Sequence, residues 1–182
     1  MSTLLSDMRW DESHPLNFIE IRKILDARGG RLHGLRCGYV DLESVRGELT
    51  LKRFLPGTHN ACAILLTTNL PGTRGMQRHW VALVRNSKGI FFFDSLKLGY
   101  PTLTKLLGSN RFVRFLKTIK AKETHKRLQA DVKGIRTCGL WVATRLWQYK
   151  LSNSEFHHYI THAPSCLKPD QTVALLTMIG HV

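Results

Sequence analysis

The chain has 182 residues, 43% of which are hydrophobic, and its 27 Lys and Arg against 13 Asp and Glu give a formal net charge of +14. This length and composition exclude a disordered chain, and no repeat period indicates a solenoid, so we expect a single domain over residues 1–182. A net charge of roughly 2 to 8 suffices for the solubility of a small domain, so the additional positive charge favours a polyanionic partner such as DNA.

The cysteines lie far apart and include no CxxC pair; they are Cys37, Cys62, Cys138 and Cys166. The segment 1–15 lacks the charged and then apolar pattern of a secretory signal. No apolar run approaches the roughly 20 residues of a membrane span. We therefore expect reduced thiols inside a cell and no membrane partner. No pair of His and Cys residues has a zinc-finger spacing, so we expect no metal site.

Apolar residues at helical spacing predict a first helix over residues 16–25, which the glycine pair at 29–30 ends. Glycines interrupt residues 32–54, and this pattern predicts irregular segments or edge strands. The apolar run 61–68 predicts a buried strand, which a glycine-rich loop over residues 71–77 follows.

Two apolar runs around the polar segment 85–88 predict a β-hairpin. If this segment is a four-residue loop, Val84 lies opposite Gly89. The same register then places His79 opposite Asp94, with Cβ atoms about 5 Å apart, which allows a hydrogen bond from the imidazole to the carboxylate. A loop one residue longer would put the two side chains on opposite faces of the sheet.

The region 100–120 predicts a helix that is broken near residues 108–110. A basic stripe repeats every three residues beside its apolar face, and further basic residues follow. We predict nucleic-acid contacts for Arg111, Arg114, Lys117, Lys120, Lys122, Lys126 and Arg127. A helix face that only contacts water would explain the same pattern.

Residues 138–147 are apolar on nearly every side and predict a buried central helix that begins at Cys138. For residues 157–162 we expect a short strand or turn, and for 172–178 a final helix. For the whole chain we expect an α+β fold in which helices pack on a central sheet.

Cys138 has the position of a nucleophilic thiol, because the first turn of a helix lowers the pKa of a cysteine. Arg136 adds positive charge, and Gly139 leaves space for a substrate backbone. A small buried core cysteine is the alternative explanation of Cys138 taken alone.

His79 opens a strand directly after the glycine-rich loop, where a general base can reach a substrate. Asp94 would orient this imidazole. The oxygen of a tetrahedral intermediate also needs hydrogen-bond donors, and the backbone N–H of Cys138 and the side-chain amide of Gln129 are candidates for this oxyanion hole. These residues together predict a Cys-His-Asp triad.

In these motifs the chain resembles the adenovirus protease (adenain) family, part of the clan that includes the SUMO and ubiquitin-like-protein proteases. The resemblance covers roughly residues 16–150. Its four pieces, in order, are Ala61-Cys62-Ala63-Ile64, His79-Trp80 at the start of a strand, Asp94 after Phe91-Phe92-Phe93, and Gln129 ahead of Cys138-Gly139-Leu140. The resemblance implies a papain-like fold, with a central mixed sheet and the nucleophile at the start of a buried helix. It also implies that Trp80 and Gly139 lie beside the substrate.

The function implied by this resemblance is that of a viral cysteine endopeptidase, which cleaves capsid or core precursors during virion maturation in the virion and the host nucleus. DNA and a viral activating peptide would be its binding cofactors, and the chemistry requires no other. The family joins its peptide to a cysteine shortly before the oxyanion Gln, whereas this chain has no Cys between Cys62 and Cys138. Two further departures are a longer segment from Gln129 to Cys138 and Asp instead of Glu at position 94.

Three other functions fit the same residues. A deubiquitinase or deSUMOylase would use the same triad on the C-terminus of a ubiquitin-like protein. An acetyltransferase of the bacterial effector type shares the order of His, acid and Cys. A non-enzymatic DNA-binding protein would explain the charge but would leave the triad unexplained.

Overall fold

The structure, a computed structural model, describes residues 15–68, 77–130, 137–162 and 167–178. In chain order its elements are helix α2 (Phe18–Ala27), strand β1 (Cys37–Asp41), the 3-10 helix η1 (Leu42–Ser44), α3 (Leu51–Phe54), β2 (Ala61–Thr68), β3 (Gln77–Asn86), β4 (Gly89–Phe93), α4 (Gly99–Leu107), α5 (Arg111–Thr118), α6 (Cys138–Trp147), α7 (Asn153–Thr161) and α8 (Pro169–Met178). Helices packed on a mixed sheet make this an α+β fold, which confirms the predicted class at that level.

The sheet has four strands in the order β1-β2-β3-β4. β1 runs parallel to β2, whereas β2, β3 and β4 are antiparallel neighbours. Lys122 covers part of the outer edge of β4: its backbone N–H donates to the carbonyl of Ile90, and its carbonyl accepts from Phe92 N–H, both at 2.9 Å. This cover satisfies backbone groups that an edge strand would otherwise expose.

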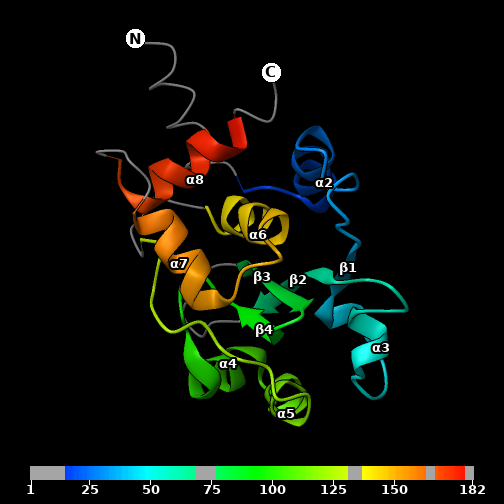
Figure 1. Cartoon of the computed structure of the whole chain (residues 1–182). Coiled ribbons are helices and arrows are strands. Elements are labelled where there is room, and N and C mark those ends of the chain that lie inside the picture. The colour runs from blue at the N-terminus through cyan, green and yellow to red at the C-terminus, as the bar shows by residue number, and fades with distance from the viewer. Residues whose placement is uncertain (1–14, 69–76, 131–136, 163–166, 179–182) are drawn as a thin grey trace.

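Helices cover both faces of the sheet, because alternate side chains of each buried strand point to opposite sides. From β2, Ala61, Ala63 and Leu65 pack toward α2, α6 and α8. Cys62 and Ile64, whose side chains point to the other face, pack toward α4 and α5. Figure 1 shows α6 directly on one face of the sheet, with α4 and α5 on the other. The helix that begins at Cys138 is therefore an inner layer of the fold.

α6 is buried around its whole circumference, as its apolar sequence predicts, and it also contains the fully buried Arg145. The Arg145 guanidinium donates to the carbonyls of Gln148 and Leu151 at 3.0 and 2.9 Å. Burial lowers the pKa of Arg145 to about 9, although the charge of Glu155 acts in the opposite direction. Arg145 thus provides a further hydrogen-bond donor to carbonyl groups beyond the end of α6.

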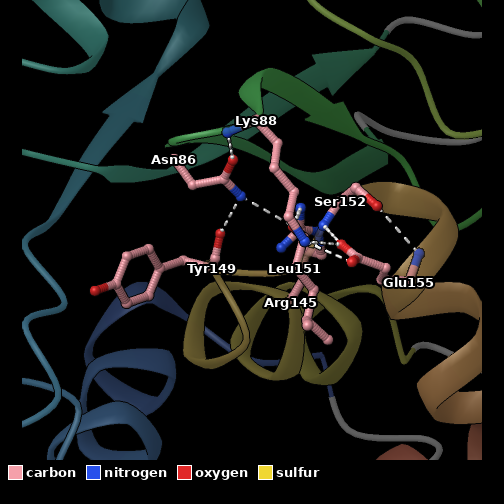
Figure 2. Close-up of polar contacts among 7 residues, drawn as sticks. All are labelled: Asn86, Lys88, Arg145, Tyr149, Leu151, Ser152 and Glu155. Carbon is pink, nitrogen blue, oxygen red and sulfur yellow. Dashed lines mark hydrogen bonds and ion pairs between the residues drawn. The ribbon is translucent and has the colours of Figure 1, made fainter.

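Figure 2 shows how the β3–β4 hairpin is attached to the segment between α6 and α7. The side-chain amide of Asn86 donates to the carbonyls of Tyr149 and Leu151 at 2.9 and 3.2 Å. Lys88 forms an ion pair with Glu155, with its Nζ 2.5 and 2.6 Å from the two carboxylate oxygens. These contacts hold β3 against α6, the two elements that carry His79 and Cys138.

The predicted four-residue hairpin loop is wrong. Asn86 pairs with Gly89 and Val84 with Phe91, so the turn has two residues. The shorter turn is favoured because the side chain of Asn86 accepts the N–H of Lys88 at 2.8 Å, and because Gly89 adopts a φ of 129° that suits glycine.

The first helix, the strand 61–68, the break near residues 108–110 and the helix from Cys138 are confirmed. So is the final helix, which begins earlier than predicted, at Pro169. β1 is an edge strand within the region where edge strands or irregular segments were expected. The predicted glycine-rich loop falls mainly on residues 69–76, outside the described residues.

The short strand or turn predicted for residues 157–162 is wrong, because most of this segment belongs to α7. A capping box starts that helix: the Ser152 hydroxyl accepts the N–H of Glu155, and the Glu155 carboxylate accepts the N–H of Ser152. These cap residues precede residues 157–162, whose histidines and Tyr159 do not by themselves indicate a helix.

Candidate active site

His79 and Asp94 form a buried hydrogen bond, with Nε2 2.8 Å from Oδ1. The predicted contact between the imidazole and the carboxylate is present, but the predicted strand register, with His79 directly opposite Asp94, is wrong. Ala82 pairs with Phe93, so the next positions outward are Val81 and Asp94, and His79 lies two residues further along β3. Diagonal neighbours across antiparallel strands are about 7 to 8 Å apart at Cα, still within reach of an imidazole.

The Asp94 carboxylate is held by the backbone that follows β4. Oδ1 accepts the N–H of Leu96 at 3.0 Å, and Oδ2 accepts the N–H of Leu98 at 2.8 Å. Burial acts to raise the pKa of Asp94, but the hydrogen bond and charge of His79, together with these amides, lower it overall. The carboxylate is therefore ionised and fixed in orientation when it meets the imidazole.

Cys138 is the first residue of α6, and its thiol interacts with the side chain of His79. The backbone amides of Trp80 and Gly139 also act on this thiol. Burial acts to raise the pKa of Cys138, but His79 and these amides lower it below the ordinary thiol value. Because Asp94 takes Nε2 of His79, Nδ1 is the other ring nitrogen that can exchange a proton with the sulfur.

The pKa of His79 is raised to about 10. Burial acts to lower it, but the hydrogen bond to Asp94, the interaction with Cys138 and the charges of both residues outweigh burial. A raised imidazole pKa next to a lowered thiol pKa stabilises a thiolate–imidazolium pair at neutral pH. This is the protonation state in which a cysteine attacks a carbonyl group.

The other described cysteines show the opposite behaviour. Burial raises the pKa of Cys37 to about 12 and that of Cys62 well above its usual value. Cys62 lies fully buried in β2. Among the cysteines in the described part of the chain, the lowered pKa is specific to Cys138 and arises from its contact with His79.

Gln129 is buried beside the residue that follows Asp94. Its Oε1 accepts the hydroxyl of Ser95 at 2.7 Å, and its backbone N–H donates to the Ser95 carbonyl at 3.0 Å. Ser95 thereby assigns the amide orientation: the oxygen faces the hydroxyl, and the NH2 group is directed away from it. This leaves the donor end for another acceptor, and the oxyanion role of Gln129 stays a prediction.

No family model and no curated protein sequence matches the chain. The geometry of the described residues therefore has to support any function by itself.

Trp80 and Gly139, the residues predicted to lie beside a substrate, both contact Leu16. The indole Nε1 of Trp80 donates to the Leu16 carbonyl at 2.8 Å. A Cβ at Gly139 would lie 2.8 Å from the Cβ of Leu16, so a larger residue does not fit there. The space that the absent side chain leaves is filled by Leu16 of the same chain, and the role of both residues toward a substrate stays a prediction.

Three of the residues predicted to contact nucleic acid donate to backbone carbonyls: Arg111 to Val45 and Gly47, Lys122 to Lys88, and Arg127 to Leu96. The side chains of Arg114, Lys117, Lys120 and Lys126 are exposed, as are those of Lys122 and Arg127. Lys120 follows the end of α5 with a φ of 52°, so it is not a member of the helical stripe.

Three polar residues that organise this site were not predicted from the sequence: Ser95, Thr124 and Asp170. Ser95 could have been considered because it directly follows Asp94. The Thr124 hydroxyl accepts the N–H of Asp94 at 2.9 Å, and Asp170 contacts residues on both sides of the segment 131–136. No local pattern indicates either contact, because both join segments that are distant in the sequence.

Within residues 15–68, 77–130, 137–162 and 167–178, no group of three or more His, Cys, Asp or Glu side chains is arranged to hold a metal ion. In the same part of the chain no helix has the length and apolar character to cross a bilayer. Arg136, predicted to add charge near Cys138, and Cys166 lie outside the described residues.

Proposed function

We propose that this protein is a cysteine endopeptidase whose nucleophile is Cys138. One observation carries the proposal: His79, in a buried hydrogen bond to Asp94, interacts with Cys138, so that the pKa of the thiol is lowered and the pKa of the imidazole is raised. A cysteine that serves only as core packing has no need of such partners, as the raised thiol pKa of Cys62 illustrates.

In the first half of the reaction the Cys138 thiolate attacks the carbonyl carbon of the scissile bond, and the carbonyl electron pair moves onto oxygen. The Cys138 N–H and the Gln129 amide stabilise this oxyanion. The intermediate then collapses and the C–N bond breaks. The leaving amine takes its proton from the His79 imidazolium, and a thioester to Cys138 remains.

In the second half a water molecule attacks the thioester while neutral His79 accepts its proton. The second oxyanion uses the same donors. Its collapse releases the carboxylic acid product and returns the Cys138 thiolate beside the His79 imidazolium. Asp94 keeps the ring in one orientation through both halves and stabilises its positive charge, without becoming protonated itself.

The finer features of the proposal are an adenain-like, papain-type fold and a role in cleaving viral precursor proteins. They are supported by the order of the motifs and by a helix that begins at the nucleophile and packs on a mixed sheet. DNA is a proposed binding cofactor because the net charge is +14. The exposed basic side chains of α5 lie on the sheet face opposite α6, so DNA bound there would leave Cys138 accessible.

The test is the rate of alkylation by iodoacetamide from pH 4 to 9, with each modified cysteine identified by mass spectrometry. The expected result is selective labelling of Cys138 at pH 6 that is lost in His79→Ala, whereas Cys37 and Cys62 react slowly in both proteins. A substrate panel of viral precursor peptides, ubiquitin-like fusions and acetyl-CoA then identifies the reaction. Slow labelling of Cys138 with an ordinary thiol profile would overturn the proposal.

A further inference from the structure

Asp170, in the first turn of α8, is a buried acid that accepts three hydrogen bonds. Its Oδ2 accepts the backbone N–H of Ala130 at 2.8 Å. Its Oδ1 accepts the hydroxyl of Thr137 at 2.5 Å and the indole N–H of Trp141 at 2.8 Å. One carboxylate therefore contacts the chain on both sides of residues 131–136 and also the first turns of α6.

These partners are the neighbours of the two groups that would bind the oxyanion. Ala130 follows Gln129, and Thr137 precedes Cys138. Gln129 is held from its other side by Ser95, through the side-chain and backbone hydrogen bonds already described. The segment that carries Gln129 is thus fixed at two points, one of which is the same carboxylate that holds the start of α6.

Thr137 occupies the N-cap position of α6, but its side chain makes no capping hydrogen bond. Its hydroxyl donates to Asp170 instead. An N-cap hydroxyl normally accepts one of the first free N–H groups of a helix. The Thr137 side chain therefore joins the start of α6 to α8 and does not cap α6.

We propose that Asp170 is a positioning residue that fixes the Gln129 amide relative to the Cys138 N–H and so assembles the oxyanion hole. This inference rests on the proposed protease function. A carboxylate is suited to the task because both of its oxygens accept hydrogen bonds. An Asn side chain has an acceptor at one end only, so it must lose either the bond from Ala130 or the pair from Thr137 and Trp141.

The test compares Asp170→Asn with the wild-type protein in three measurements: peptide cleavage, inhibition by a peptide aldehyde, and alkylation by iodoacetamide at pH 6. Misplacing an oxyanion donor should lower kcat about 10- to 100-fold with little change in KM. Aldehyde affinity should fall by a similar factor, because the hemithioacetal oxygen occupies the same site. Alkylation should be unchanged, since it needs the Cys138–His79 pair and no oxyanion hole.

The double variant Gln129→Ala with Asp170→Asn separates positioning from general stability. If Asp170 acts through Gln129, the double variant should be about as slow as Gln129→Ala alone. If the losses of kcat in the two single variants multiply in the double variant, the inference is contradicted. It is also contradicted if folded Asp170→Asn has the kcat and aldehyde affinity of the wild type. If Asp170→Asn does not fold, Thr137→Val keeps the side-chain shape and removes one of the three hydrogen bonds. It should then lower kcat and aldehyde affinity together and leave alkylation intact, and a wild-type result would overturn the inference.

The two proposals fail in different ways. A wild-type protein that cleaves no substrate and shows no His79-dependent alkylation overturns the protease function and this role with it. If the wild-type protein is active and Asp170→Asn has the same kcat and aldehyde affinity, only the positioning role is overturned.

Discussion

The His79 imidazole and the Asp94 carboxylate are bonded diagonally across two strands, with Nε2 2.8 Å from Oδ1. Backbone amides of Leu96 and Leu98 bind the same carboxylate and help to keep it ionised. The fixed negative charge contributes to a His79 pKa of about 10. The proton of the neighbouring Cys138 thiol therefore moves to the imidazole at a pH where an isolated cysteine would keep it.

Cleavage should be abolished in both Cys138→Ala and His79→Ala, because the first removes the nucleophile and the second removes the group that holds its proton. Initial rates on a precursor peptide, measured by chromatography, check this. Cys37→Ala is the matched control, since Cys37 is half-buried and has a raised pKa. It should keep activity within about twofold. A strong loss in Cys37→Ala would mean that the nucleophile has been misassigned.

The pH profile of kcat/KM should rise as the Cys138 thiol ionises, at a pH below the ordinary value, and fall near pH 10 as His79 loses its proton. Asp94→Asn removes a charge that raises the His79 pKa, so the alkaline limb should move to lower pH. The same variant should retain measurable activity, because Asp94 orients the base and does not exchange protons with the substrate. An alkaline limb that stays in place would refute the role of Asp94.

Gln129→Ala should lower kcat by about 10² to 10³ with KM nearly unchanged, which is the usual cost of one oxyanion donor. Ser95→Ala removes the hydroxyl that orients the amide and should produce a smaller loss of the same kind. Steady-state kinetics on one peptide test both variants, and circular dichroism checks their folding. A rise in KM at constant kcat would instead assign Gln129 to substrate binding.

DNA affinity should become less dependent on salt when Arg114 and Lys117 are replaced by Gln. Each lost phosphate contact should reduce the slope of log K against log salt by about 0.9. Lys23→Gln on α2 is a matched control, because Lys23 is also exposed and is removed from α5. Fluorescence anisotropy over a range of salt concentrations gives the slopes. Equal changes in the control would indicate binding through net charge without a defined surface.

Arg145→Met should lower the free energy of unfolding by about 2 to 4 kcal/mol, because it removes the hydrogen bonds that a fully buried guanidinium donates to the carbonyls of Gln148 and Leu151. Urea denaturation measures this change. Lys88→Met breaks a half-exposed ion pair with Glu155 in the same network and should leave the urea midpoint almost unchanged. If the two variants have similar urea midpoints, the buried contacts of Arg145 do not stabilise the fold more than the exposed ion pair does.

Several features could be predicted because neighbouring residues determine them. The strand at 61–68 is a continuous apolar run, and the helix from Cys138 is apolar on nearly all sides. The hairpin register could not be predicted, because it depends on one hydrogen bond from the backbone N–H of Lys88 to the Asn86 side chain, which favours the shorter turn. The α7 helix was missed for a related reason, since its start depends on the reciprocal cap between Ser152 and Glu155.

The sequence by itself determined the candidate nucleophile, the base and the acid, since a cysteine at the start of a buried helix and a histidine and an aspartate in one hairpin are local features. Only the tertiary structure decided that Ser95 orients Gln129, that Arg111 anchors a loop, and that Asp170 binds both flanks of residues 131–136. The physical reason is that hydrogen bonds between distant segments depend on how helices pack on the sheet, and no pattern of neighbouring residues encodes that packing.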